Sequence, residues 1–174
     1  MHSAEQLFAI LDEMSIEHST IEHPPVFTVD EAKVHTAHLP GGHCKSLFLK
    51  DKKGGLWLLV CLEARRIDMN ALAKAVSCPR LSFGKPDLLF EILGVTPGSV
   101  TPFALINDRE QRIGLILDQA MLQEELLNYH PLTNEATTTI KAADLMTFLT
   151  STGHEALVID LDGGGIDRSR KDAF

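Results

Sequence analysis

Residues 41–60, GGHCKSLFLKDKKGGLWLLV, predict a β-hairpin that carries a lysine on its apolar face. One apolar run begins at about Ser46, a second ends at Val60, and DKKGG between them has the composition of a turn. Because side chains alternate along a strand, Lys45 shares its face with Leu47 and Leu49. Burying an ammonium group among apolar side chains costs free energy. The position of Lys45 therefore needs an explanation other than packing.

The rest of the chain predicts a single α/β domain with a mixed sheet. Its 174 residues can bury one substantial core, and 44% hydrophobic with 23% charged residues is an ordinary globular composition. Strands and helices alternate irregularly, which excludes eight regular βα units. We expect one domain over residues 1–162 and a disordered tail over 163–174. Helices are expected from Ser3, from Thr28, and at about 69–77, 86–93, 119–127 and 142–151, and strands at about 18–22, within the hairpin, and at about 103–107, 112–118 and 156–161.

Cysteine usage and the N-terminus predict a cytoplasmic protein. The three cysteines have no close pair, which fits neither a disulfide framework nor a zinc site and indicates reduced thiols. MHSAEQLFAILDEM lacks the features of a signal peptide, and no apolar run approaches the roughly 20 residues that span a bilayer, so no membrane partner is expected. Cys44, beside Lys45, is a candidate nucleophile. A small semi-buried thiol is the favoured interpretation, because no base is evident beside it.

Basic residues are concentrated between residues 45 and 85. This segment holds nine Lys or Arg residues against three acids, a net charge of +6, whereas the whole chain carries −8 and the remainder therefore −14. The segment is either a solvated surface or a cationic patch for a phosphate-bearing ligand, with the acidic remainder limiting non-specific binding. A patch of this size suits contact with one end of a nucleic acid. The expected contacts are Arg65, Arg66, Lys74, Arg80 and Lys85.

Two polar segments later in the chain hold further candidates. TPGSVTP (96–102) has glycine and proline breaks before an apolar run, which is typical of a tight turn but also of a loop whose N–H groups face a carbonyl or phosphate. NYHPLTN (128–134) gathers a histidine, two amides and a threonine around one proline. Its His130 is the best candidate for general acid–base chemistry or polar recognition, and a satisfied structural histidine is the alternative.

Metal and phosphate motifs find less support. HTAHLPGGH (35–43) places three histidines at spacings that match no established zinc site, so we expect no metal and no cofactor. GVTPGSVT lacks the lysine that a P-loop needs. VIDLDGG contains an Asp-x-Asp pattern of the dehalogenase type, but the chain that follows is too short for the rest of such a domain.

Four segments together resemble one family. HPPVFTVDEA, GGHCKSLFLKDKKGGLWLLV, LGVTPGSVTPFALIND and NYHPLTNEATTTI occur in the order found in the freestanding prolyl-tRNA editing proteins, which share the fold of the YbaK proteins and of the editing domain inserted in bacterial prolyl-tRNA synthetases. The resemblance spans roughly residues 3–162. It implies an α/β domain that deacylates mischarged tRNA(Pro), and it is strongest for the subgroup that removes alanine.

The resemblance also assigns roles to residues. The family's essential lysine falls on Lys45, where it would stabilise a phosphate or developing negative charge. Its Gly-x-x-x-Pro loop falls on Gly98–Pro102, where N–H groups around Gly98 and Ser99 would hold the ester carbonyl and position water, and its histidine falls on His130. No side-chain nucleophile is implied, because the vicinal hydroxyl of the sugar helps to activate the water. The candidate substrate-binding residues are His23, Ser46, Pro102 and Asn134, together with Phe27, Val29 and Tyr129. The last three flank the motifs and are candidates for the pocket walls, with ordinary core packing as the alternative.

The sequence leaves the substrate and the partners open in part. Many relatives have asparagine where this chain has Ser46, whose hydroxyl still donates and accepts hydrogen bonds. The implied partner is the acceptor end of tRNA(Pro), with a prolyl-tRNA synthetase as a further candidate. A deacylase for cysteine, serine or threonine, and a non-catalytic aminoacyl-tRNA-binding or regulatory module, remain as alternatives.

Overall fold

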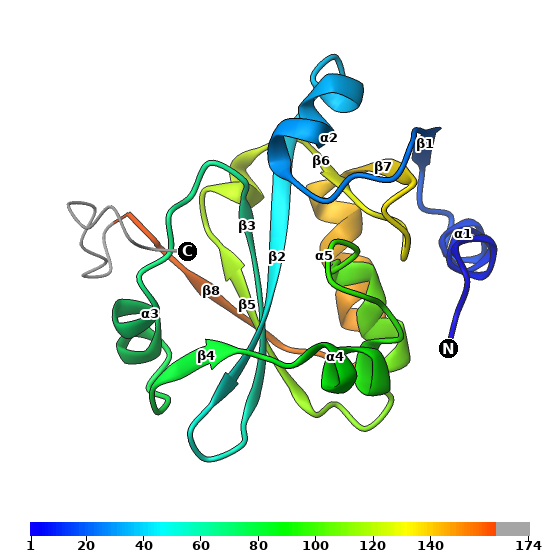
Figure 1. The fold of residues 1–174 in the computed structure, drawn as a ribbon. Coiled ribbons are helices and arrows are strands. Elements are labelled where there is room, and N and C mark those ends of the chain that lie inside the picture. The colour runs from blue at the N-terminus through cyan, green and yellow to red at the C-terminus, as the bar shows by residue number, and fades with distance from the viewer. Residues whose placement is uncertain (163–174) are drawn as a thin grey trace.

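The computed structural model describes residues 1–162, and it has the mixed α/β architecture that the sequence predicts (Figure 1). The predicted tail, residues 163–174, lies outside the described residues. The strands are β1 His18–Glu22, β2 Gly42–Asp51, β3 Leu56–Leu62, β4 Leu81–Phe83, β5 Ile113–Asp118, β6 Leu126–Tyr129, β7 Ala136–Lys141 and β8 Ala156–Ile159. Within the described residues they form one sheet in the order β1-β7-β6-β2-β3-β5-β8, with β4 paired to β2. The β2–β6, β3–β5 and β5–β8 pairs are parallel and the other pairs are antiparallel.

Helices pack against both faces of this sheet. The α-helices are α1 Ala4–Glu13, α2 Val29–Thr36, α3 Met69–Ala75, α4 Pro86–Leu93 and α5 Ala142–Ser151, and the 3₁₀ helices are η1 Pro102–Asn107 and η2 Met121–Gln123. The larger core joins α1, α4, η1 and α5 to one face, whereas α3 covers a smaller core on the other (Figure 1). None of the helices in the part of the chain described here is long and apolar enough to cross a membrane.

The predicted hairpin is confirmed as β2 and β3, and its turn is held by a single carboxylate. The Asp51 side chain accepts hydrogen bonds from the backbone N–H groups of Lys53 and Gly55 and from the indole N–H of Trp57. Gly54 has φ +92°, which favours glycine. The resulting register pairs Lys45 with Cys61 and Leu49 with Trp57. Lys45 therefore lies on the face that β2 presents to the smaller core, as the alternation predicts.

Local helix signals are also confirmed. Ser3 and Gln6 form a reciprocal capping box, and the Thr28 hydroxyl accepts the N–H of Glu31 at the start of α2. The α4 helix begins with Pro86 and ends at Gly94, which has φ +68°. These contacts satisfy backbone groups that a helix end would otherwise leave without partners.

Two predicted elements are wrong. The strand expected at 103–107 is the 3₁₀ helix η1, which Thr101 caps by accepting the N–H of Phe103. The helix expected at 119–127 is the short η2 followed by β6, whose backbone pairs with β2 and β7 instead of with itself. The 112–118 strand is confirmed as β5, which pairs in parallel with β3 and β8.

Candidate active site

A pocket opens where β2 and β6 separate. The two strands pair only through Gly42 with Leu127 and His43 with Asn128, after which β2 continues beside β3 and, from Leu49 on, also beside β4. The volume of the pocket is about 190 Å³, below the roughly 300–1,000 Å³ of sites for drug-sized ligands, so it suits a group of amino-acid size. It is lined by Val26, Phe27, Thr28, Val29, Ala32, Cys44, Lys45, Ser46, Glu63, Gly98, Val100, Tyr129 and His130.

The structure brings seven of the predicted catalytic and substrate-binding residues together in this lining. They come from segments far apart in the sequence and are Phe27, Val29, Lys45, Ser46, Gly98, Tyr129 and His130. Four others do not line the pocket: His23, Ser99, Pro102 and Asn134. The buried fraction of the lining differs from residue to residue, since Tyr129 is 4% exposed whereas Phe27 is 71% exposed.

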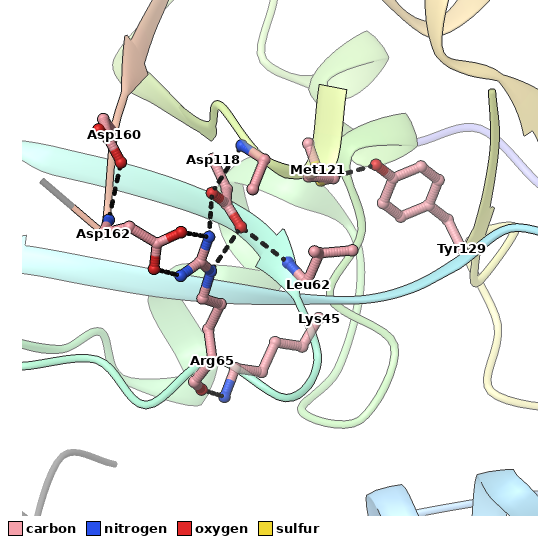
Figure 2. A network of polar contacts seen from close by, with 9 residues as sticks. Lys45, Leu62, Arg65, Asp118, Met121, Tyr129, Asp160 and Asp162 are labelled. Carbon is pink, nitrogen blue, oxygen red and sulfur yellow. Dashed lines mark hydrogen bonds and ion pairs between the residues drawn. The ribbon is translucent and has the colours of Figure 1, made fainter. Parts of the chain in front are cut away.

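Lys45 is half-buried and is one of the residues that line the pocket. The Nζ atom donates a hydrogen bond to the backbone carbonyl of Arg65 (Figure 2). Burial lowers the pKa of Lys45, and the nearby Glu63 carboxylate acts in the opposite direction. A cation held in such a partly desolvated place interacts more strongly with an anion than it would in water.

The loop at 96–100 contributes Gly98 and Val100 to the pocket lining. Gly98 has φ +92°, and a Cβ there would meet its neighbours at ordinary contact distances of 3.7 Å or more, so backbone conformation and not crowding favours glycine. The N–H of Ser99 donates to the carbonyl of Thr96 at 3.0 Å, and the Ser99 side chain is buried. Within the described residues the N–H groups of Gly98 and Val100 donate to no protein acceptor. These two N–H groups, rather than that of Ser99, can bind a ligand.

His130 is held in one tautomer by the backbone. Its Nδ1 donates to the carbonyl of Ala136 at 3.0 Å, so Nε2 carries the lone pair of the neutral ring. Burial lowers the pKa of His130, which favours that neutral form. His23 lies edge-on to His130 with ring centroids 6.3 Å apart, and its own Nε2 bonds the Thr137 hydroxyl. His23 therefore packs beside His130 without lining the pocket.

Three other predicted residues have contacts within the protein: Asn134 and Pro102 lie outside the pocket lining, and Tyr129 lies within it. Asn134 and Val26 exchange two hydrogen bonds, which fixes the segment before Phe27. Pro102 is buried at the first position of η1. The Tyr129 hydroxyl donates to the sulfur of Met121 at 3.1 Å, so its ring forms an apolar wall.

Six lining residues were not among the predicted site residues: Val26, Thr28, Ala32, Cys44, Glu63 and Val100. Glu63 is the one carboxylate in the lining. Its N–H donates to the carbonyl of His43, so the hairpin register continues past β3 and Glu63 shares a face with Cys61 and Lys45. That register could have identified it. Burial raises the pKa of the Cys44 thiol to about 12, which favours the inert interpretation of this cysteine.

The predicted cationic contacts separate into two groups. Arg66, Lys74, Arg80 and Lys85 are exposed, on the turn after β3, on α3, before β4 and at the start of α4. Arg65 is different: its side chain is 18% exposed, and its guanidinium pairs with Asp118 and Asp162 (Figure 2). The hydrogen bonds that Arg65 donates to Asp162 and Asp118 raise its pKa. Among residues 1–162 no three His, Cys, Asp or Glu side chains form a group that could hold a metal ion.

Comparisons with known proteins place this geometry in context. Residues 23–148 match the family model of the aminoacyl-tRNA editing domain. The chain is 40% identical over 154 residues to the prolyl-tRNA synthetase associated domain-containing protein 1 of Bos taurus, covering 86% of this chain and 90% of that protein. It is 30% identical over 162 residues to the prolyl-tRNA editing protein ProX of Acetoanaerobium sticklandii, covering 92% and 99%. A crystal structure described as "a putative trans-editing enzyme for prolyl tRNA synthetase" superposes with a TM-score of 0.68 at 19% identity, covering 92% and 98%.

Proposed function

The chain belongs to the aminoacyl-tRNA editing domain family, and on that premise we propose that it hydrolyses mischarged tRNA(Pro), with alanyl-tRNA(Pro) as the preferred substrate. The observation that carries the proposal is the convergence of Lys45, the 96–100 loop and His130 on one small pocket. These groups come from three separate parts of the chain, and packing alone does not require them to meet.

The chemical groups of the pocket complement those of an aminoacyl ester on a terminal adenosine. The substrate carries an α-ammonium group, an ester carbonyl and a nearby phosphate. The lining offers the Glu63 carboxylate, the N–H groups of Gly98 and Val100, and the Lys45 ammonium. In the proposed complex Glu63 binds the α-ammonium group, the loop binds the carbonyl oxygen, and Lys45 stabilises the phosphate and the charge that develops on the ester.

Hydrolysis in this site needs no side-chain nucleophile. Cys44 is a poor candidate because burial raises its pKa to about 12, so almost no thiolate exists near neutral pH. His130 offers the Nε2 lone pair as an acceptor for a ribose hydroxyl or for the attacking water. The vicinal hydroxyl of the sugar then assists the water, with His130 as an orienting group.

The exposed cations provide the proposed binding surface for tRNA. Arg66, Lys74, Arg80 and Lys85 belong to the same stretch of chain that contributes Lys45, and their exposed charges suit the phosphates of an acceptor stem whose end enters the pocket. A prolyl-tRNA synthetase is a further partner in the proposal, since the family names connect these proteins with that enzyme.

Single-turnover hydrolysis of alanyl-tRNA(Pro) tests the proposal. The wild-type protein should release alanine, and Lys45→Ala should lose at least about a hundredfold, or roughly 2.7 kcal/mol of transition-state stabilisation. Lys45→Arg keeps the charge but changes reach and geometry, so it should restore only part of the rate. Lys141→Ala removes an exposed lysine on the far strand β7 and serves as the control. A folded Lys45→Ala protein with the wild-type rate would contradict the mechanism and favour a non-catalytic aminoacyl-tRNA-binding module.

A further inference from the structure

A buried carboxylate at the end of β5 is connected to the pocket lysine. The Asp118 side chain is fully buried, and it accepts hydrogen bonds from the backbone N–H groups of Leu62 at 3.3 Å and Ala120 at 3.1 Å. It also accepts two from the Arg65 guanidinium, at 3.1 Å from Nε and 3.3 Å from Nη2 (Figure 2). A buried carboxylate that is satisfied by four donors fixes the groups that supply them.

Arg65 transmits this constraint to Lys45 through its backbone. The guanidinium points toward Asp118 and Asp162, whereas the carbonyl of the same residue accepts the hydrogen bond from the Lys45 ammonium (Figure 2). The turn after β3 is therefore held by a side-chain ion pair, and its backbone carbonyl at Arg65 accepts the hydrogen bond from the Lys45 ammonium. Glu63, two residues before Arg65, lies in the same turn and in the pocket lining.

The opposite end of β5 provides a comparison within the same molecule. Asp108 is as buried as Asp118, and it accepts hydrogen bonds from the N–H groups of Arg112 and Ile113 and from the Nε2 of His154. Both aspartates thus tie two backbone N–H groups to one basic side chain. The Asp108 network does not include Lys45 or any other residue of the pocket lining.

We propose that Asp118 and Arg65 are positioning residues, which hold the turn after β3 so that its carbonyl places the Lys45 ammonium for catalysis. The role follows from the flexibility of lysine, whose four-carbon stem does not fix the ammonium by itself. A displacement of about 1 Å in a reacting geometry can reduce a rate a hundredfold. The inference rests on the proposed function, and it changes the expected role of Arg65 from a contact with tRNA to a support within the protein.

Kinetics of matched variants test this role. Arg65→Met and Asp118→Asn should each lower the single-turnover rate at saturating alanyl-tRNA(Pro) at least about tenfold with KM little changed, and Arg65→Lys, which keeps the charge but loses the bidentate geometry, should lie between. Asp108→Asn should lower thermal stability as Asp118→Asn does but leave the rate at 25 °C unchanged. If Arg65→Met instead raises KM and flattens the salt dependence at an unchanged rate, Arg65 is a tRNA contact and the inference is wrong.

A double-mutant cycle and a chemical measurement separate positioning from general destabilisation. In a Lys45→Ala background Arg65→Met should have almost no further effect on the rate, because the group that Arg65 positions is already absent.

Labelling by an amine-specific reagent, followed by mass spectrometry, should show Lys45 reacting at least about threefold faster in Arg65→Met than in wild type, with exposed Lys50 as the internal reference. This labelling needs no tRNA. If the wild type deacylates nothing, the proposed function fails while the labelling still decides the positioning. Unchanged labelling of Lys45 overturns it.

Discussion

Glu63 and Lys45 place opposite charges on the same face of one hairpin, and each has a local partner. Lys33 on α2 lies 4.0 Å from the Glu63 carboxylate and is itself exposed, so water screens this pair. The Glu63 side chain is only 18% exposed, and it is the lining's one carboxylate. An incoming α-ammonium group would thus find a partly desolvated acceptor that an exposed lysine only weakly neutralises.

Glu63→Gln should weaken recognition of the α-ammonium group without unfolding the protein. We expect the variant to lose about tenfold or more in kcat/KM on alanyl-tRNA(Pro), as truncating one partner of a charge-assisted hydrogen bond does. The decisive comparison uses lactyl-tRNA(Pro), in which a hydroxyl replaces the amino group: wild type should prefer the alanyl ester, and Glu63→Gln should show little preference. Glu91→Gln, which removes an exposed ion pair with Arg112, is the matched control. A wild-type protein that hydrolyses both esters equally would assign Glu63 another role.

His130 should make both activity and stability depend on pH. Burial lowers its folded-state pKa below 6.5, so in the window beneath 6.5 the unfolded chain binds a proton that the folded protein does not. The stability contribution is complete above about pH 6.5 and is lost as the pH falls through the lowered folded pKa. Protonation also removes the Nε2 acceptor, so the deacylation rate should fall in the same range.

Two measurements check this expectation. His130→Ala should cost roughly ten- to a hundredfold in rate if the ring orients a hydroxyl and transfers no proton, and it should flatten the acid limb of the rate profile. Urea titrations at several pH values should show that the variant loses less stability than wild type between pH 7 and 5. An acid limb that persists unchanged in His130→Ala would assign the titration to another group.

At the scale of elements, the segment from β2 to β4 brings the pocket lysine and the exposed cations into one part of the molecule. The α3 helix packs on the β2–β3 hairpin beside β4, on the side of the sheet away from α4 and α5 (Figure 1). Arg66, Lys74 and Arg80 lie on this part and have no ion-pair partner among the described residues. Their charges are therefore available to phosphates.

Replacing Arg66, Lys74 and Arg80 together by glutamine should raise KM and leave the single-turnover rate at saturation nearly unchanged. Each lost phosphate contact should also reduce the salt dependence of log K by about 0.9 for a duplex stem. Filter binding of tRNA(Pro) over a range of salt concentrations measures the affinity and its salt dependence, and single-turnover kinetics measure KM and the rate at saturation. The control removes Arg109 and Lys141, which lie outside this segment. Equal affinities at every salt concentration would show that the segment is only a solvated surface.

Elements whose signals are local were predictable, and those decided by distant contacts were not. Capping residues and the turn composition identified α1, α2, α4 and the hairpin, because each signal acts within a few residues. The short apolar run 103–106 is compatible with a strand or a helical turn, and burial on all sides in the structure removes the alternation that would distinguish them. Residues 119–127 have helical spacing, yet pairing with β2 and β7 overrides that preference.

At the scale of the whole molecule, the site is assembled by contacts that no single segment reveals. Motif resemblance pointed to Lys45, Gly98 and His130, and hairpin register would have added Glu63. The parallel pairing of β2 with β6, whose separation opens the pocket, joins residues more than 80 positions apart. Arg65 and Asp118 are 53 positions apart, and no local signal connects them, so the sequence presents Arg65 as one more surface cation.

The choice of amino acid should depend on the volume of the whole pocket, because its apolar walls come from the segment before α2, α2 itself, the 96–100 loop and β6. One methylene changes a hydrophobic fit by about 1–3 kcal/mol, which corresponds to roughly 10–200-fold in rate. We therefore expect alanyl-tRNA(Pro) to be hydrolysed fastest, seryl- and cysteinyl-tRNA more slowly, and prolyl-tRNA at least about tenfold more slowly than alanyl-tRNA.

Enlarging the pocket tests whether volume sets this order. Val100 lines the pocket and is partly buried, so Val100→Ala should enlarge the pocket by removing two methyl groups from its wall. The ratio of the hydrolysis rates of alanyl- and prolyl-tRNA should then fall several-fold, mainly because prolyl-tRNA is hydrolysed faster. Val34→Ala, on a valine that is 80% exposed and outside the lining, makes the same chemical change without altering the pocket. Single-turnover rates on the four esters give the answer. If Val100→Ala slows all four substrates equally, the wall contributes to stability alone, and discrimination must come from polar contacts such as those of Ser46.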